Sequence, residues 1–181
     1  MSTQLDKLLP LLVNGDVEFI LIGGVAGNVL GSARLTFDVD VVYDRSKVNL
    51  ERMAKLLKPQ SPYLRGAPPG LPFVLDVPTL RNGLNFTLTT KLGDLDLLGE
   101  VVGGGGYKEL LPHTFVVSAF GVKFRCVDLP TLIKLKRAAG RPKDLESIAE
   151  LQTLLEEGKR SRPLRTCGNM QRSKASPKKR R

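Results

Sequence analysis

Asp38 and Asp40 stand two residues apart in the β-rich segment 37–42, FDVDVV. Because successive side chains of a strand point to opposite faces, both carboxylates would lie on the same face. Carboxylate oxygens suit Mg²⁺, which usually takes one or two of them together with water and substrate phosphates. The pair therefore predicts a site for a divalent cation and chemistry on phosphate groups.

A second acidic segment, GDLDLL at residues 93–98, repeats this spacing with Asp94 and Asp96. Three carboxylates in one site would repel each other and raise one another's pKa values, and a divalent cation relieves that repulsion. Such an arrangement suits in-line phosphoryl transfer. The spacing alone does not show whether Asp94 or Asp96 joins Asp38 and Asp40. The alternation of Asp94 and Asp96 with apolar residues also fits a strand whose polar face is exposed to solvent.

Gly23 and Gly24 separate an expected buried strand over 17–22 from an expected short helix over 25–30. A glycine pair in this place lets a helix N-terminus approach a phosphate closely. The spacing does not match the Gly-x-Gly-x-x-Gly pattern of dinucleotide-binding folds. The four glycines at 103–106 lack the lysine and hydroxyl residue of a P-loop, and they predict a flexible connection.

Together these segments resemble the DNA polymerase β-type nucleotidyltransferase superfamily. The glycine pair followed by Asp38 and Asp40 looks like its signature, although many members carry Gly-Ser in place of Gly-Gly. Three further segments are similar to its small prokaryotic branch, which includes minimal nucleotidyltransferases and abortive-infection type nucleotidyltransferase-like toxins. They are RLT at 34–36, GDLDLL at 93–98 and KLKRAAGRPKD at 134–144, and the similarity spans about residues 15–157.

The resemblance implies a Mg²⁺-dependent enzyme that moves a nucleoside monophosphate from a nucleoside triphosphate to a hydroxyl group. It implies that Asp38 and Asp40 are catalytic metal ligands for one or two ions, and that a third acid completes the metal site or serves as base. Asp96 is preferred to Asp94 for this role because its apolar flanks look more like the family's motif. The implied contacts to the triphosphate come from Gly23, Gly24, Arg34, Thr36 and Lys136.

Lys136 lies in a basic segment of the helix expected over 129–139. Cations there could hold a triphosphate and stabilise charge on the leaving pyrophosphate. Basic residues on an amphipathic helix also commonly form a solvated face, and cations near a helix C-terminus complement its dipole. The residues alone leave both interpretations open, and the resemblance favours the first for Lys136.

The resemblance also implies partners. ATP or another nucleoside triphosphate is the donor, and RNA, a protein hydroxyl or a small molecule is the acceptor. A toxin–antitoxin or phage-defence setting would add an antitoxin-like protein partner. Two alternatives stay open: a catalytically silent binding module with the same fold, and a nucleic-acid-binding protein that acts through a basic tail.

The charge distribution predicts that tail. The chain has 181 residues and a formal net charge of +10, and the whole excess lies in residues 158–181. A neutral domain over 1–157 is large enough to bury a core. The segment 158–181 carries ten basic and no acidic residues and is expected to be disordered. It could attract RNA or DNA through their phosphates, although it has no aromatic residue for base stacking.

Hydrophobic patterning predicts interleaved strands and helices, hence an α+β (mixed α/β) fold. The resemblance adds a small mixed sheet flanked by helices, with helices at the C-terminal end of the domain. Helices are expected over 3–13, 25–30, 50–57, 129–139 and 143–155, and strands over 17–22, 37–42, 85–90, 94–101, 115–119 and 122–127. The Pro- and Gly-rich segment 59–78 is expected to be irregular, with a strand near 73–77.

Other classes of protein are disfavoured. No segment approaches the roughly 20 apolar residues of a membrane span, and no secretory signal is evident. Cys126 and Cys167 are too few and too far apart for a disulfide scaffold or a zinc site. These features favour a reducing, cytoplasmic setting without a membrane partner.

Overall fold

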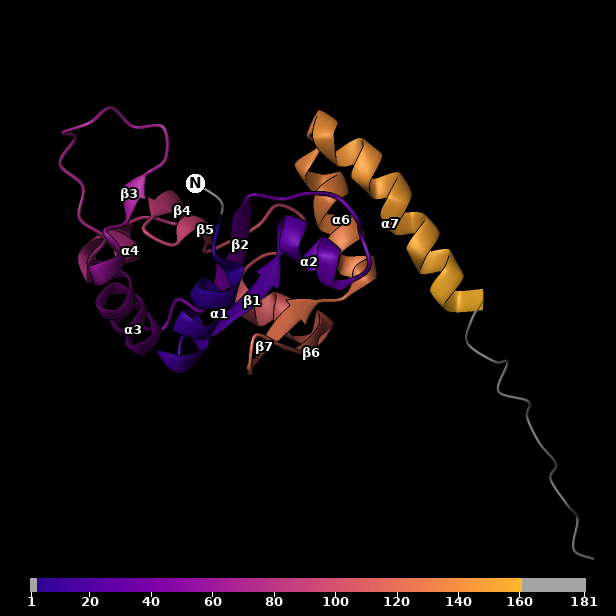
Figure 1. Cartoon of the computed structure of the whole chain (residues 1–181), viewed down its shortest axis with the longest axis horizontal. Coiled ribbons are helices and arrows are strands. Elements are labelled where there is room, and N and C mark those ends of the chain that lie inside the picture. Colours follow the sequence, from indigo (N-terminus) through magenta and orange to yellow (C-terminus); the bar gives the residue numbers. More distant parts are fainter. Residues whose placement is uncertain (1–2, 161–181) are drawn as a thin grey trace, which may run out of the picture.

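The computed structural model describes residues 3–160, in which seven strands form one mixed sheet of order β3-β4-β5-β2-β1-β7-β6 (Figure 1). Strand β2 pairs antiparallel with β1 and parallel with β5, and β1 pairs parallel with β7. The strands are β1 (Phe19–Ile22), β2 (Asp38–Tyr43), β3 (Tyr63–Leu64), β4 (Asn85–Thr90), β5 (Gly93–Leu98), β6 (Thr114–Ala119) and β7 (Val122–Val127). The expected α+β class and mixed sheet are confirmed.

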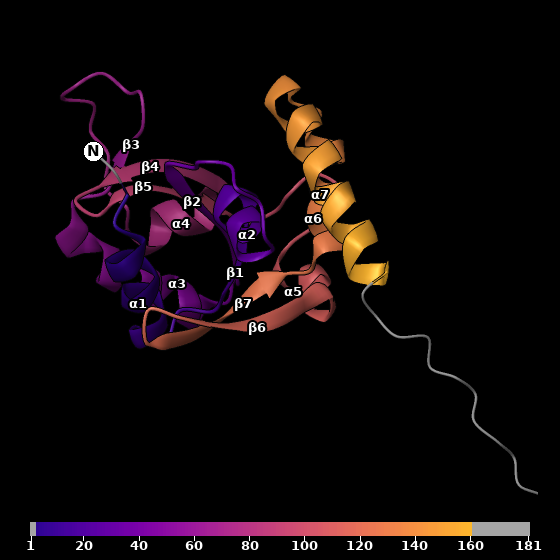
Figure 2. The same cartoon turned by 45° about the vertical axis from the view of Figure 1, so that its right-hand side comes forward.

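Helices cover both sides of the central strands. Figures 1 and 2 show α1 and α3 on one side of β1 and β2, and α2 on the other side next to α6 and α7. The α-helices are α1 (Leu5–Asn14), α2 (Gly23–Val29), α3 (Lys47–Leu57), α4 (Val77–Asn82), α5 (Tyr107–Leu110), α6 (Leu129–Ala139) and α7 (Pro142–Arg160). Short 3₁₀ turns occupy Lys58–Gln60 and Leu111–His113.

The burial pattern of the strands separates the core face of the sheet from the face that carries polar groups. All four residues of β1 are buried, as expected of a central strand covered on both faces. In β5 and in the first half of β2 burial alternates: Val39 and Leu95 are fully buried, whereas the neighbouring aspartates are partly exposed. Val39 and Leu95 therefore face the core, and the aspartates lie on the opposite face of the sheet.

Helices α6 and α7 form a hairpin whose ends are set by local chemistry. The Asp128 carboxylate accepts a hydrogen bond from the Thr131 N–H at 2.9 Å and caps α6. Gly140, with φ +63°, ends α6 in the left-handed conformation, and Pro142 then begins α7. The hairpin packs beside α2 and brings the basic end of α6 toward the aspartates.

The glycine run at 103–106, expected to be a flexible connection, packs closely against α6. A Cβ on Gly104 would lie 2.5 Å from Leu135 Cδ2, and one on Gly103 would lie 2.6 Å from Ala138 Cβ. Because these glycines have no side chain, the backbone of the segment can approach the helix closely.

Most expected elements are confirmed within a few residues at their ends, but the strand expected near 73–77 is wrong. Residues 73–76 are irregular and α4 begins at Val77, because the Asp76 carboxylate accepts from the Thr79 N–H at 2.8 Å and Pro78 suits a first helical turn. Helix α7 continues to Arg160, past the expected boundary at 157. The rest of the predicted basic tail, 161–181, lies outside the described residues. Within residues 3–160, no helix combines the length and apolar character needed to cross a bilayer.

Candidate active site

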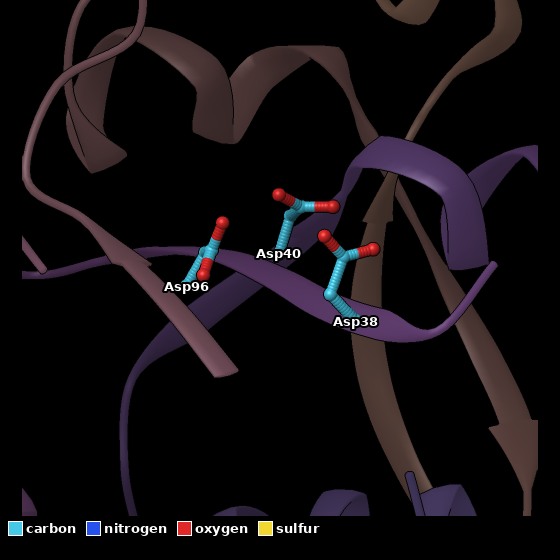
Figure 3. A group of neighbouring side chains, drawn as sticks. All are labelled: Asp38, Asp40 and Asp96. Carbon is cyan, nitrogen blue, oxygen red and sulfur yellow. The ribbon is translucent and has the colours of Figure 1, made fainter. Parts of the chain in front are cut away.

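The pairing of β2 with β5 brings the two acidic segments together. Their parallel register places Asp38 beside Asp94 and Asp40 beside Asp96. One carboxylate oxygen from each of Asp38, Asp40 and Asp96 lies within 4.8 Å of the other two. Figure 3 shows the three side chains rising on the same side of the two strands. A set of three oxygen donors at this spacing suits a hard divalent cation.

Gly23 and Gly24 make room for this cluster. Gly23 has φ +69°, and a Cβ on it would lie 2.0 Å from Asp40 Oδ2. A Cβ on Gly24 would lie 2.4 Å from Thr36 Oγ1. The Gly24 N–H also donates a hydrogen bond to Asp40. The glycine pair therefore lets the start of α2 pass directly against the acidic strand, and its expected contact with phosphate stays a prediction.

Asp40 is the most perturbed of the carboxylates. Burial raises its pKa to about 7, and the like charges of Asp38 and Asp96 add to this effect. The Gly24 N–H and the positive charge of Arg141 act in the opposite direction but do not offset the burial. Burial and the neighbouring carboxylates therefore disfavour the ionised form of Asp40 in the metal-free site.

Thr36 orients the first aspartate. Its hydroxyl donates to Asp38 Oδ1 at 3.0 Å. This contact occupies the hydroxyl in the metal-free protein and turns the Asp38 carboxylate toward the cluster. Thr36 also lines the cavity beside the aspartates. Its expected contact with a nucleotide stays a prediction.

Arg34 connects the segment before β2 to α7 through ion pairs. Its Nη2 lies 3.1 Å from Glu146 Oε2, and its Nε lies 3.2 Å from Glu150 Oε2. Glu150 also accepts from the Ala33 N–H at 2.9 Å. Arg34 lines the cavity, as expected of a residue near a nucleotide, and its guanidinium already has two carboxylate partners.

Lys136 faces the same cavity from α6. Its ammonium lies 3.1 Å from Asp144 Oδ1, and the two side chains are only 16% and 10% exposed. The Lys–Asp part of the basic segment is therefore a largely buried ion pair between α6 and α7. Arg141 also lines the cavity and lies near enough to lower the pKa of Asp40, and it has no carboxylate partner among the residues whose placement is described.

A cavity of about 580 Å³ joins these groups. It extends from the aspartates and the glycine pair to the α6–α7 hairpin, a volume typical of small-molecule sites. Of the predicted site residues, those that line it are Gly23, Gly24, Arg34, Thr36, Asp38, Asp40 and Lys136. Asp96 belongs to the carboxylate cluster but not to the cavity lining.

Arg65 is a residue of the site that no sequence pattern predicts. Its Nη2 lies 2.6 and 2.9 Å from the two oxygens of Asp96, and its Nη1 lies 3.2 Å from Asp94 Oδ2. Burial lowers the pKa of Arg65, but these carboxylates outweigh it and raise the pKa above its ordinary value. The residue lies in the Pro- and Gly-rich segment 59–78, where no spacing or periodicity marks it as functional.

Comparisons with known proteins bear on the fold. Profiles of known protein families give no match to the chain, and neither do the curated protein sequences. Among solved structures, the fold resembles that of a protein described as a presumed nucleotidyltransferase. One similar structure is the crystal structure of this protein from Thermotoga maritima, with a TM-score of 0.50 and 14% identity. The match covers 84% of this chain and 91% of that one, so it extends over nearly the whole described domain.

Proposed function

We propose that the protein is a Mg²⁺-dependent nucleotidyltransferase that moves a nucleoside monophosphate from a nucleoside triphosphate to a hydroxyl acceptor. One observation carries the proposal: three carboxylates, from Asp38, Asp40 and Asp96, converge within 4.8 Å at the edge of a cavity bordered by basic residues. The nucleotidyltransferase-like fold supports it.

The donor set fits the metal that this chemistry needs. Asp38 and Asp40 line the cavity and offer carboxylate oxygens as ligands. A bound cation would offset the repulsion between Asp40 and the charges of Asp38 and Asp96. These two carboxylates would hold Mg²⁺. The bound ion would supply charge stabilisation for the transferred phosphoryl group and the leaving oxygen.

The other residues of the site have separate tasks. Lys136 and Arg34 line the cavity and would stabilise the leaving pyrophosphate by exchanging their present carboxylate partners on α7 for phosphate oxygens. Gly24 keeps the start of α2 against the aspartates, and Thr36 holds the Asp38 carboxylate in place. Asp96, on the neighbouring strand β5, is the third carboxylate of the cluster and would orient or deprotonate the acceptor hydroxyl.

A transfer assay tests the proposal and searches for the acceptor at the same time. The purified chain is incubated with Mg²⁺, each α-³²P-labelled nucleoside triphosphate, and separate RNA, protein and small-molecule fractions. We expect label to be transferred to one fraction by the wild type and not by Asp38→Asn or Asp40→Asn. The exposed Asp16→Asn variant is the matched control and should transfer label normally. Equal transfer by all variants would overturn the proposal.

A further inference from the structure

The Arg65 guanidinium contacts the acidic cluster, and neither it nor Asp96 belongs to the cavity lining. It contacts both oxygens of Asp96 at 2.6 and 2.9 Å and Asp94 at 3.2 Å, and it lies 3.9 Å from Asp38. Its side chain is 28% exposed. One nitrogen, Nη2, faces both oxygens of Asp96, and Nη1 faces Asp94, so the guanidinium bridges two carboxylates. Hydrogen bonds between charged groups of this kind are shorter and stronger than neutral ones.

The sheet holds Arg65 in this position. Asp40 pairs with Asp96, Asp96 pairs with Thr87 of β4, and the Arg65 N–H donates to the Thr87 carbonyl at 2.9 Å. These four residues therefore form one row across neighbouring strands. Since Thr87 is short and exposed, the long arginine side chain can extend across it to reach Asp96.

The loop after Arg65 is also anchored. The Tyr63 hydroxyl donates to the Pro68 carbonyl at 2.7 Å and accepts from the Leu71 N–H at 3.0 Å. The Tyr63 ring also packs edge-on against Phe73. The segment that carries Arg65 is thus fixed to the sheet edge on both sides of the residue, so the guanidinium is a built-in part of the site.

We propose that Arg65 takes the place of a second metal ion, so that the site binds one divalent cation between Asp38 and Asp40. This inference rests on the proposed function. Both oxygens of Asp96 already face a positive charge, and a second cation there would have to displace the guanidinium. Arg65 is then a positioning residue, which holds the third carboxylate in place and supplies permanent positive charge beside the reacting groups.

Mn²⁺ binding to the full chain tests the inference without any enzymatic reaction. The free ion is followed by electron paramagnetic resonance during a titration at low protein concentration, without nucleotide. We expect one bound Mn²⁺ in the wild type. Asp40→Asn should weaken binding about tenfold or more, because it removes a charged ligand. Asp96→Asn should leave the affinity within about threefold, because both oxygens of Asp96 contact the Arg65 guanidinium and not the ion.

Removal of the guanidinium gives the complementary result. Arg65→Met should bind a second Mn²⁺, since Asp96 and Asp94 are then free to accept a cation. Arg52→Met, which removes an exposed arginine that contacts the Asp16 carbonyl, is the control and should still bind one ion. Circular dichroism spectra establish whether each variant is folded. If Arg65→Met does not fold, the Mn²⁺ affinity of Asp96→Asn still tests whether Asp96 is a metal ligand.

The outcomes separate the inference from the proposed function. Two ions on the wild type, or a loss of affinity of about tenfold in Asp96→Asn, would overturn the role of Arg65 and leave a metal-dependent transferase in place. An absence of bound Mn²⁺ on the wild type would overturn both proposals. One ion on the wild type and two on Arg65→Met would support both.

Discussion

Replacement of Asp40 by asparagine should stabilise the metal-free protein at neutral and alkaline pH. The pKa of Asp40 is raised from 3.8 to about 7, first by burial and then by the charges of Asp38 and Asp96. One pKa unit corresponds to about 1.4 kcal/mol, so ionising Asp40 in the folded protein costs up to about 4 kcal/mol. Asparagine has nearly the same shape and cannot ionise, so the variant avoids this cost.

The sign of the pH dependence follows from whether the folded or the unfolded chain binds the Asp40 proton more tightly. Between about pH 4 and about pH 7 the folded protein retains a proton on Asp40 that the unfolded chain has lost, so wild-type stability falls as pH rises. Above about pH 7 the Asp40 carboxylate is ionised in both states and its contribution to the decline stops. The advantage of the asparagine variant should therefore grow across this window and then stay constant.

Urea unfolding in the presence of a chelator, at several values between about pH 5 and about pH 8, measures the difference directly. The exposed Asp6→Asn variant is the matched control and should stay within about 0.5 kcal/mol of the wild type at every pH. A difference between wild type and Asp40→Asn that does not change with pH would refute the electrostatic reasoning. So would a wild type that is more stable than the variant at high pH.

Three further outcomes are expected. Asp96→Asn should lower the turnover of nucleotide transfer by about 100-fold and Asp94→Asn by less than about tenfold, since Asp94 accepts from the Thr89 hydroxyl and stands outside the three-carboxylate cluster. Lys136→Met should raise KM for the nucleoside triphosphate more than it lowers kcat, and the exposed Lys134→Met should leave both unchanged. Deletion of 161–181 should weaken RNA binding and flatten its salt dependence without altering transfer to a small acceptor, and an unchanged salt slope would deny this segment a nucleic-acid role.

The strands of the site are predictable from the sequence because their chemistry is local. In β2 and β5 each aspartate alternates with a buried apolar residue, so the period of two is visible directly. Helix α6 is equally recognisable, since Asp128 caps its start and Gly140 ends it. Strand β3 has only two residues, too few to show a period, and its existence depends on pairing with β4.

The site itself is only partly predictable. The spacing of Asp38 and Asp40 indicates that they share a face, but the position of Asp96 beside Asp40 depends on a parallel register between strands far apart in the chain. Arg65 reaches the same cluster from another strand edge, across Thr87, and no local pattern reports such a contact. Pairing between distant segments leaves no local pattern in the sequence, because it forms only when the sheet assembles.

The fate of the α- and γ-phosphates of the nucleotide in one reaction tests the central claim most directly. In the presence of Mg²⁺, we expect α-label to enter the acceptor and γ-label to be released as pyrophosphate in equal amounts. We expect neither with Asp38→Asn. Transfer of γ-label to the acceptor, or release of inorganic phosphate without any transfer of α-label, would show that the protein is not a nucleotidyltransferase.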